Sequence, residues 1–193
     1  MNYLAHLYLS FGHEEIMVGN YIADSVKGRQ IERFSEKIQK GIRLHRNIDE
    51  FTDNHPIVEN SKARIRDRYR KYSGVIIDMF YDHYLAAGWK NYSNDELIDF
   101  TRQSYKTLLR HYVTMPARMK RILPFMAAGN WLASYAEVDN IGLALRGMSR
   151  RTKFDSGMEN GGEELKLHYH EFKNDFSEFF PELIAFSRRK INA

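Results

Sequence analysis

Two polar side chains lie on a face of one predicted helix that is otherwise apolar. In the stretch 36–53, Ile38, Ile42, His45 and Asp49 are spaced four, three and four residues apart. Side chains at these spacings share one face of an α-helix. Burying an ionised carboxylate without a partner is costly. Asp49 must therefore be compensated by a cation, a hydrogen-bond donor or a metal ion.

A second pair of this kind occurs in the predicted helix 74–88. Asp82 falls on the stripe that Val75 and Met79 begin, and His83 lies one step around the helix. His and Asp together are the ligands expected for Mn²⁺, Fe²⁺ or Mg²⁺, or for Zn²⁺ with nitrogen and oxygen donors. Each pair alone is more often a structural hydrogen bond or ion pair; two pairs in one small protein strengthen the case for a divalent-metal site and leave both interpretations open.

Two further polar residues lie near the N-terminus. Asp24 comes one turn after Asn20 and away from the densest apolar stripe, which is typical of a surface aspartate. His6 lies in LAHLYLSF, a stretch too short and too uniformly apolar for its facing to be predicted. Taken alone, His6 fits a hydrogen-bonded core histidine better than a metal ligand.

The elements that must position these side chains are all predicted to be helices. No segment shows the sustained alternation of apolar and polar residues that is typical of a strand. We expect an all-α fold of about eight or nine helices, in a single domain that spans residues 1–193. The expected helices cover residues 14–28, 36–53, 57–72, 74–88, 94–113, 117–135, 138–150 and 163–189, with a loop at 156–162 and a break at Pro181.

Composition indicates a globular protein of a reducing compartment. The 193 residues are 43% hydrophobic and 28% charged, and twelve Phe, twelve Tyr and two Trp can build a core. The chain has no Cys, which excludes disulfides, thiolate metal sites and a Cys nucleophile. It shows no signal-peptide pattern and no apolar run near the ~20 residues that span a bilayer. We expect a soluble, cytoplasmic protein.

Basic residues form clusters on a chain whose net charge is only +4. Any one cluster fits a solvated helix face, but together they favour an acidic macromolecular partner. No nucleic-acid-binding motif accompanies them, which disfavours nucleic acid as that partner. The clusters are Arg64, Arg66, Arg68, Arg70 and Lys71; Arg118, Lys120 and Arg121; Arg146, Arg150, Arg151 and Lys153; and Arg188, Arg189 and Lys190.

Several segments, in order along the chain, closely resemble the acyl carrier protein phosphodiesterase family. They are MNYLAHLYLS (1–10), GNYIADSVKG (19–28), GIRLHRNIDEFTDNHP (41–56), DMFYDHYLAAGW (78–89) and NWLASYAEVDNIGLALRGMSRR (130–151). That family is similar to the HD-type metal-dependent phosphohydrolases, which are all helical and hold a divalent ion with His and Asp. The resemblance implies Mn²⁺-dependent hydrolysis of the phosphodiester that joins 4′-phosphopantetheine to a serine of holo-acyl carrier protein.

The resemblance also implies which residues hold the ion. As core ligands we expect His45, Asp82 and His83, with His6 and Asp24 completing or flanking the shell. One departure from the family pattern bears on this set, because the consecutive pair reads Asp-His rather than His-Asp and the standard ligand order does not transfer directly. The matched polar positions are His6, Asp24, His45, Arg46, Asp49, Asp53, Asp82 and His83.

The remaining implied roles concern catalysis and the carrier protein. Asp49 is expected as a ligand or as the group that orients a histidine. Arg46 is expected as a phosphate clamp, because a guanidinium matches the geometry of phosphate oxygens; its alternative is a structural partner of Asp49 or Glu50. The expected catalytic set is Asp24, His45, Arg46, Asp49 and Asp82. Since acyl carrier proteins are small and acidic, the expected substrate-protein contacts are Arg64, Arg68, Arg146, Arg150 and Arg151.

Two other functions are compatible with the same residues. One is an HD-type phosphohydrolase of nucleotides or other small phosphodiesters, which would turn over free small molecules. The other is a non-catalytic helical module that binds an acidic protein without metal. The opening motif also has Tyr8 where many relatives place a second histidine.

Overall fold

The computed structural model describes residues 1–192, which contain eleven α-helices, six short 3-10 helices and no strand. The all-α prediction is therefore confirmed. The α-helices are α1 (Tyr3–Tyr8), α2 (Glu14–Ile22), α3 (Glu36–Asp53), α4 (Pro56–Tyr69), α5 (Ser73–Ala87), α6 (Leu97–Arg110), α7 (Ala117–Ala128), α8 (Trp131–Ser134), α9 (Val138–Ser149), α10 (Gly161–Leu167) and α11 (Tyr169–Asn192). The 3-10 helices are η1 (Ala23–Ser25), η2 (Gly28–Arg33), η3 (Arg70–Tyr72), η4 (Trp89–Asn91), η5 (Tyr112–Thr114) and η6 (Met158–Asn160).

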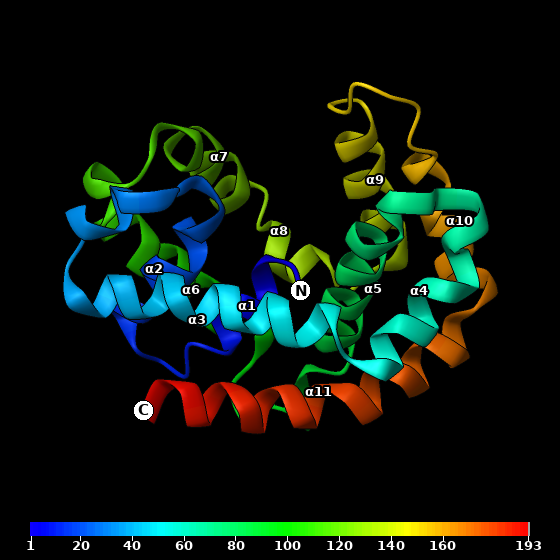
Figure 1. Ribbon diagram of the computed structural model, residues 1–193, viewed down its shortest axis with the longest axis horizontal. Helices are drawn as coiled ribbons and strands as arrows, with labels where there is room; N and C mark the ends of the chain where they lie inside the picture. Colours follow the sequence, from blue (N-terminus) through cyan, green and yellow to red (C-terminus); the bar gives the residue numbers. More distant parts are fainter. Residues whose placement is uncertain (193) are drawn as a thin grey trace.

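The helices form two lobes above a shared base (Figure 1). Helices α3 and α11 pack along each other and cross the base. Helices α2, α6 and α7 build one lobe, and α4, α5, α9 and α10 build the other. The short helices α1 and α8 lie between the lobes, so the beginning of the chain is placed at the centre of the molecule.

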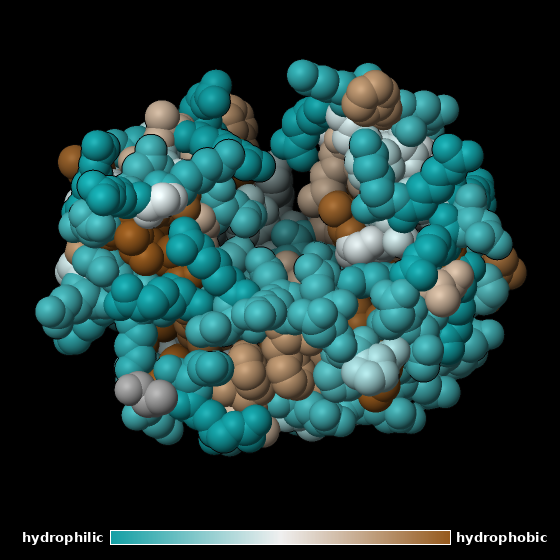
Figure 2. Space-filling model, in the orientation of Figure 1, coloured by the Kyte–Doolittle hydropathy of each residue, from teal (hydrophilic) through white to brown (hydrophobic). Residues whose placement is uncertain are grey.

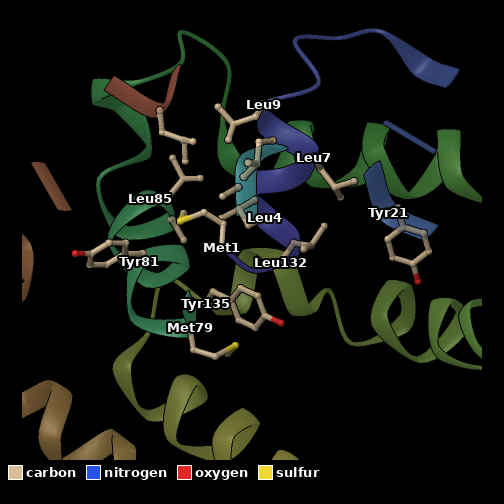
Figure 3. Packing of buried hydrophobic residues seen from close by; sticks show 14 of the residues in the cluster. Met1, Leu4, Leu7, Leu9, Tyr21, Met79, Tyr81, Leu85, Leu132 and Tyr135 are labelled. Carbon is tan, nitrogen blue, oxygen red and sulfur yellow. The ribbon is translucent and has the colours of Figure 1, made fainter. Parts of the chain in front are cut away.

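Helix α1 is buried at this centre. Leu4 and Leu7 have almost no exposed surface and belong to the same apolar core as Met79 and Leu85 of α5. Figure 3 shows these side chains beside Tyr135, which follows α8. Six residues alone form a marginal helix in water, so α1 depends on this packing.

Helices α2 and α3 touch through their backbones. A Cβ atom on Gly19 would lie 2.0 Å from the carbonyl oxygen of Ile38, and one on Gly41 would lie 2.2 Å from that of Ile16. No side chain fits at either position, so the absence of a Cβ sets the distance between the two helices. This contact brings the end of α2 next to the middle of α3.

Several helix boundaries differ from those expected. Helix α2 ends at Ile22 rather than at residue 28, and the expected loop 156–162 already contains η6 and the start of α10. The break expected at Pro181 is wrong, because α11 continues through it and the chain breaks instead at His168. Burial of Phe179, Phe180 and their neighbours holds α11 together across the lost hydrogen bond. Residues 1–192 contain eleven α-helices rather than eight or nine, because α1, α8 and α10 are too short for a periodic apolar pattern to be visible in the sequence.

None of the helices in residues 1–192 combines the length and the apolar character that a membrane span requires.

Candidate metal centre

Three side chains from two helices meet at one point. The donor atoms of His6, His45 and Asp49 all lie within 4.8 Å of one another. His45 and Asp49 are one turn apart on α3, as their spacing predicted, whereas His6 comes from α1. The imidazole rings stack with centroids 3.9 Å apart, and Asp49 lies 3.1 Å from Nε2 of each ring. His6 is thus part of the cluster as well as of the core.

Asp24 and Asn20 complete the surroundings of His45. Asp24 Oδ1 lies 3.3 Å from His45 Nε2. The Asn20 amide donates to the His6 carbonyl at 2.6 Å, so its Oδ1 accepts from His45 Nδ1 at 3.2 Å. Because Asn20 holds Nδ1–H, Nε2 is the nitrogen that faces the carboxylates. Sequence reasoning missed this role of Asn20. The sequence shows only that an amide side chain lies four residues before Asp24, and its burial is seen in the structure.

The carboxylates give the two histidines opposite electrostatic properties. Burial alone would lower the pKa of His45, but hydrogen bonds to Asp24 and Asp49 raise that pKa to about 9. Burial lowers the pKa of His6 to about 4, and the charge of His45 acts in the same direction. Burial would raise the pKa of Asp49, but hydrogen bonds from both histidines hold it well below its usual range. Near neutral pH and without an ion, the cluster therefore holds one charged and one neutral imidazole.

A second pair of charges borders the cluster. The buried α-amino group of Met1 lies 2.9 Å from Asp78 Oδ1 and 3.7 Å from Asp49 Oδ1. Burial raises the pKa of Asp78, and the charge of this amino group opposes that effect. The carboxylates next to the histidines are thus partly offset by positive charge.

The donor set fits a divalent cation. Nε2 of His6 and Nε2 of His45 each lie 3.1 Å from a carboxylate oxygen of Asp49, so two ring nitrogens and one carboxylate converge on the same place. Imidazole nitrogens and carboxylate oxygens are the donors of Mn²⁺, Fe²⁺ and Zn²⁺ sites. An ion binds deprotonated ligands and would therefore replace the proton that His45 carries. His6, His45 and Asp49, with Asp24 beside them, form the candidate metal centre.

The structure does not bring Asp82 into this cluster. Its fully buried carboxylate accepts hydrogen bonds from the backbone N–H groups of Leu4 at 2.7 Å and Ala5 at 3.2 Å. These groups belong to the first turn of α1, which has no side-chain cap of its own. Burial raises the pKa of Asp82 to about 7. Asp82 therefore acts on the site by holding the helix that carries His6.

His83 also lies outside the cluster. Its Nδ1 is 2.9 Å from the carbonyl oxygen of Tyr135, and its Nε2 is 3.1 Å from the hydroxyl of Tyr169. Both ring nitrogens thus have hydrogen-bond partners in the protein. The helical pattern correctly placed Asp82 and His83 inside the molecule. Their buried polar atoms, however, are satisfied by backbone groups and a tyrosine hydroxyl rather than by a metal ion.

Replacing Asp82 by alanine is expected to destabilise the protein by about 2–6 kcal/mol. Each buried N–H left without an acceptor costs about 1–3 kcal/mol, and the variant leaves two. Urea unfolding monitored by circular dichroism measures the change. The matched control, Asp67→Ala, alters an exposed aspartate of α4 and should stay within about 0.5 kcal/mol of the wild type. Equal stability of both variants would rule out the capping role.

The cluster opens into a cleft of about 1300 Å³ between the two lobes. Figure 2 shows the opening as a deep hollow, with α7 on one side and α9 on the other when compared with Figure 1. The apolar part of the lining comes largely from Val75, Ile122, Trp131, Leu143 and Met148. The cleft exceeds the roughly 300–1,000 Å³ typical of small-molecule pockets, so an extended substrate fits.

Two other predicted site residues are placed as follows. Arg46 is not among the residues that line the cleft, and its guanidinium donates to the carbonyl oxygen of Val26 at 3.0 Å. It holds the segment after α2 rather than facing the histidines. Asp53 does line the cleft and pairs with Lys62 of α4 at 2.8 Å.

The arginines expected to contact the carrier protein fall into two groups. Arg64 and Arg68 form ion pairs with Asp175 of α11 and Glu164 of α10. Arg146 and Arg150, at the end of α9, are exposed. The fifth, Arg151, lines the cleft. Of the five, only Arg151 therefore lines the cleft, whereas Arg146 and Arg150 are exposed nearby in the sequence and Arg64 and Arg68 pair with other helices.

An all-helical fold with a histidine–carboxylate centre in an open cleft has the character of a metal-dependent hydrolase. The chain belongs to the acyl carrier protein phosphodiesterase family, whose model matches residues 1–183. It is 30% identical over 191 residues to the acyl carrier protein phosphodiesterase of Serratia proteamaculans, covering 98% of this chain and 99% of that protein. It is 32% identical over 195 aligned residues to the Escherichia coli protein of the same name, covering 98% and 99%. No solved structure matches the chain, so the similarity to the HD fold stays a prediction.

Proposed function

We propose that this protein hydrolyses the phosphodiester bond between 4′-phosphopantetheine and the serine of holo-acyl carrier protein. The products are apo-carrier protein and 4′-phosphopantetheine, the cofactor is a divalent ion, with Mn²⁺ preferred, and the compartment is the cytoplasm. The observation that carries the proposal is the His6–His45–Asp49 cluster in a large open cleft. Membership of the acyl carrier protein phosphodiesterase family supports the reaction and the substrate.

The residues in and around the cluster have different roles in this reaction. His6, His45 and Asp49 hold the ion, and Asn20 fixes the ring of His45 through Nδ1. When bound, such an ion stabilises negative charge on phosphoryl oxygens and makes water a better nucleophile. A hydrogen bond to His45 lowers the pKa of Asp24, whose side chain is 64% exposed, so Asp24 is ionised near neutral pH and accessible to water. We assign the carboxylate of Asp24 as the acceptor of the proton from the attacking water.

The cleft fits the rest of the substrate. The phosphopantetheine arm is long and thin, and the apolar wall formed by Trp131, Leu143 and Met148 offers it a surface beside the cluster. The carrier protein itself stays outside the opening. Arg146 and Arg150 at the end of α9 are exposed and suited to its acidic surface.

The reaction is tested by intact-mass spectrometry of holo-acyl carrier protein incubated with the purified protein and Mn²⁺. We expect the carrier protein to lose the mass of one phosphopantetheine unit, and a chelator to prevent the loss. Adding Mn²⁺ in excess of the chelator should restore it. Apo-carrier protein, which lacks the arm, is the substrate control and should keep its mass.

Two outcomes would contradict the proposal. An unchanged mass with Mn²⁺, Mg²⁺, Fe²⁺ and Zn²⁺ in turn would rule out the reaction. Hydrolysis of a free small phosphodiester such as bis(p-nitrophenyl) phosphate, with no action on holo-carrier protein, would favour a small-molecule phosphohydrolase instead.

A further inference from the structure

The cleft contains three guanidinium groups that the metal centre does not use. Arg118 and Arg121 lie on α7, and Arg151 follows the end of α9. The carboxylates that line the cleft, by contrast, come from η1, α3 and α5 near the histidines. Negative charge is thus concentrated around the candidate ion, and positive charge stands on the two lobes (Figure 1).

Unlike several other surface arginines, these three have no carboxylate partner among residues 1–192. Arg64, Arg68 and Arg110 each form an ion pair with an acidic side chain of another helix. Within residues 1–192, Arg118 and Arg151 form neither an ion pair nor a side-chain hydrogen bond, and both are exposed. An unpaired guanidinium in a cleft is available to an anionic ligand.

Arg118 and Arg151 line the same cleft from opposite lobes. Tyr3, the first residue of α1, lines the cleft together with His6. Burial raises the pKa of Tyr3; the positive charges of Arg118 and Arg151 both oppose this, and the negative charge of Asp24 adds to it. The charges of both guanidinium groups thus act on Tyr3, which lines the cleft beside the arginines and the candidate metal centre.

We infer that Arg118 and Arg151 form a clamp that binds the phosphate of the substrate against the metal centre. The inference rests on the proposed function and replaces Arg46, which contacts Val26, with two arginines that line the cleft. A phosphodiester carries one negative charge shared by two oxygens. A guanidinium can donate two parallel hydrogen bonds to such oxygens, a geometry that lysine does not reproduce.

Because the two arginines lie on different lobes, the clamp can position the phosphate as well as attract it. Neither guanidinium has a hydrogen-bond or ion-pair partner among residues 1–192, so both can turn to a phosphate that enters between α7 and α9. A phosphate held from both sides would keep the phosphorus next to His6, His45 and Asp49.

The clamp is tested with Arg118→Gln and Arg151→Gln in the full chain. Binding of 4′-phosphopantetheine and of pantetheine, which lacks the phosphate, is measured by calorimetry for each variant. We expect either change to weaken 4′-phosphopantetheine binding about 10- to 100-fold, the range for one hydrogen bond between charged groups, and to leave pantetheine binding unchanged. kcat/KM for holo-carrier protein should fall by a similar factor, and Arg→Lys should restore only part of it.

Matched controls come from the neighbouring lysines Lys120 and Lys153, which do not line the cleft. Lys120→Gln and Lys153→Gln should bind 4′-phosphopantetheine like the wild type, and all four variants should melt at the wild-type temperature. The clamp is overturned if the arginine variants bind 4′-phosphopantetheine as well as the lysine variants do, or if the wild type binds it no better than pantetheine. If the wild type leaves holo-carrier protein intact, the proposed function fails and the binding comparison alone decides the clamp.

Discussion

A His45→Ala variant is expected to lose Mn²⁺-dependent hydrolysis of holo-carrier protein by a factor of about 10³ or more. His45 is the centre of the cluster: its Nε2 lies within hydrogen-bond distance of both Asp24 and Asp49, and its ring stacks on His6. A divalent ion supplies several kcal/mol of charge stabilisation to such reactions, and each 1.36 kcal/mol is about tenfold in rate. Loss of one nitrogen ligand should also weaken Mn²⁺ binding, which is measured by calorimetry.

The control for this prediction is His170→Ala. His170 is exposed on α11 and does not line the cleft, so activity and Mn²⁺ binding should both be retained. The His45→Ala protein should remain folded, because the removed ring borders the cleft and water can fill its place. If it keeps more than a tenth of the wild-type activity at saturating Mn²⁺, the metal centre lies elsewhere.

A Gly41→Ala variant is expected to lose about 4 kcal/mol or more of its free energy of unfolding. The new methyl group would lie 2.2 Å from the carbonyl oxygen of Ile16 and 2.9 Å from the Cα of Gly19. Overpacking against side chains costs about 1–3 kcal/mol, but here both neighbours are backbone of α2 and cannot rotate away. Helices α2 and α3 must separate, which also moves Asn20 and Asp24 from His45.

Urea unfolding of Gly41→Ala and of a second glycine variant measures this effect. Gly147→Ala makes the same change in α9, where a Cβ would meet nothing within 4 Å. It should be neutral or stabilise by up to about 1 kcal/mol, because alanine favours the helix more than glycine does. Comparable stability of the two variants would show that the α2–α3 contact is not as close as described.

The two halves of the metal centre were not equally predictable. His45 and Asp49 could be paired from the sequence because both belong to α3, whose expected bounds agree with the structure. Within one helix the backbone geometry fixes which residues share a face, whatever the rest of the chain does. The same rule correctly placed Asp82 inside the molecule. It could not show whether a metal ion or the first turn of α1 meets that carboxylate.

The sequence by itself thus determined the helical class, the face of α3 that carries His45 and Asp49, and the family of the protein. Only the tertiary structure decided that His6 joins that face, that Asn20 orients His45, and that Arg118 and Arg151 rather than Arg46 line the cleft. Each of these depends on which surfaces of separate helices meet. Those surfaces are selected by long-range packing, such as the close approach at Gly19 and Gly41, and by burial of helices as short as α1. Spacing along the chain carries no information about such contacts, because they join segments whose relative position is fixed only when the whole core forms.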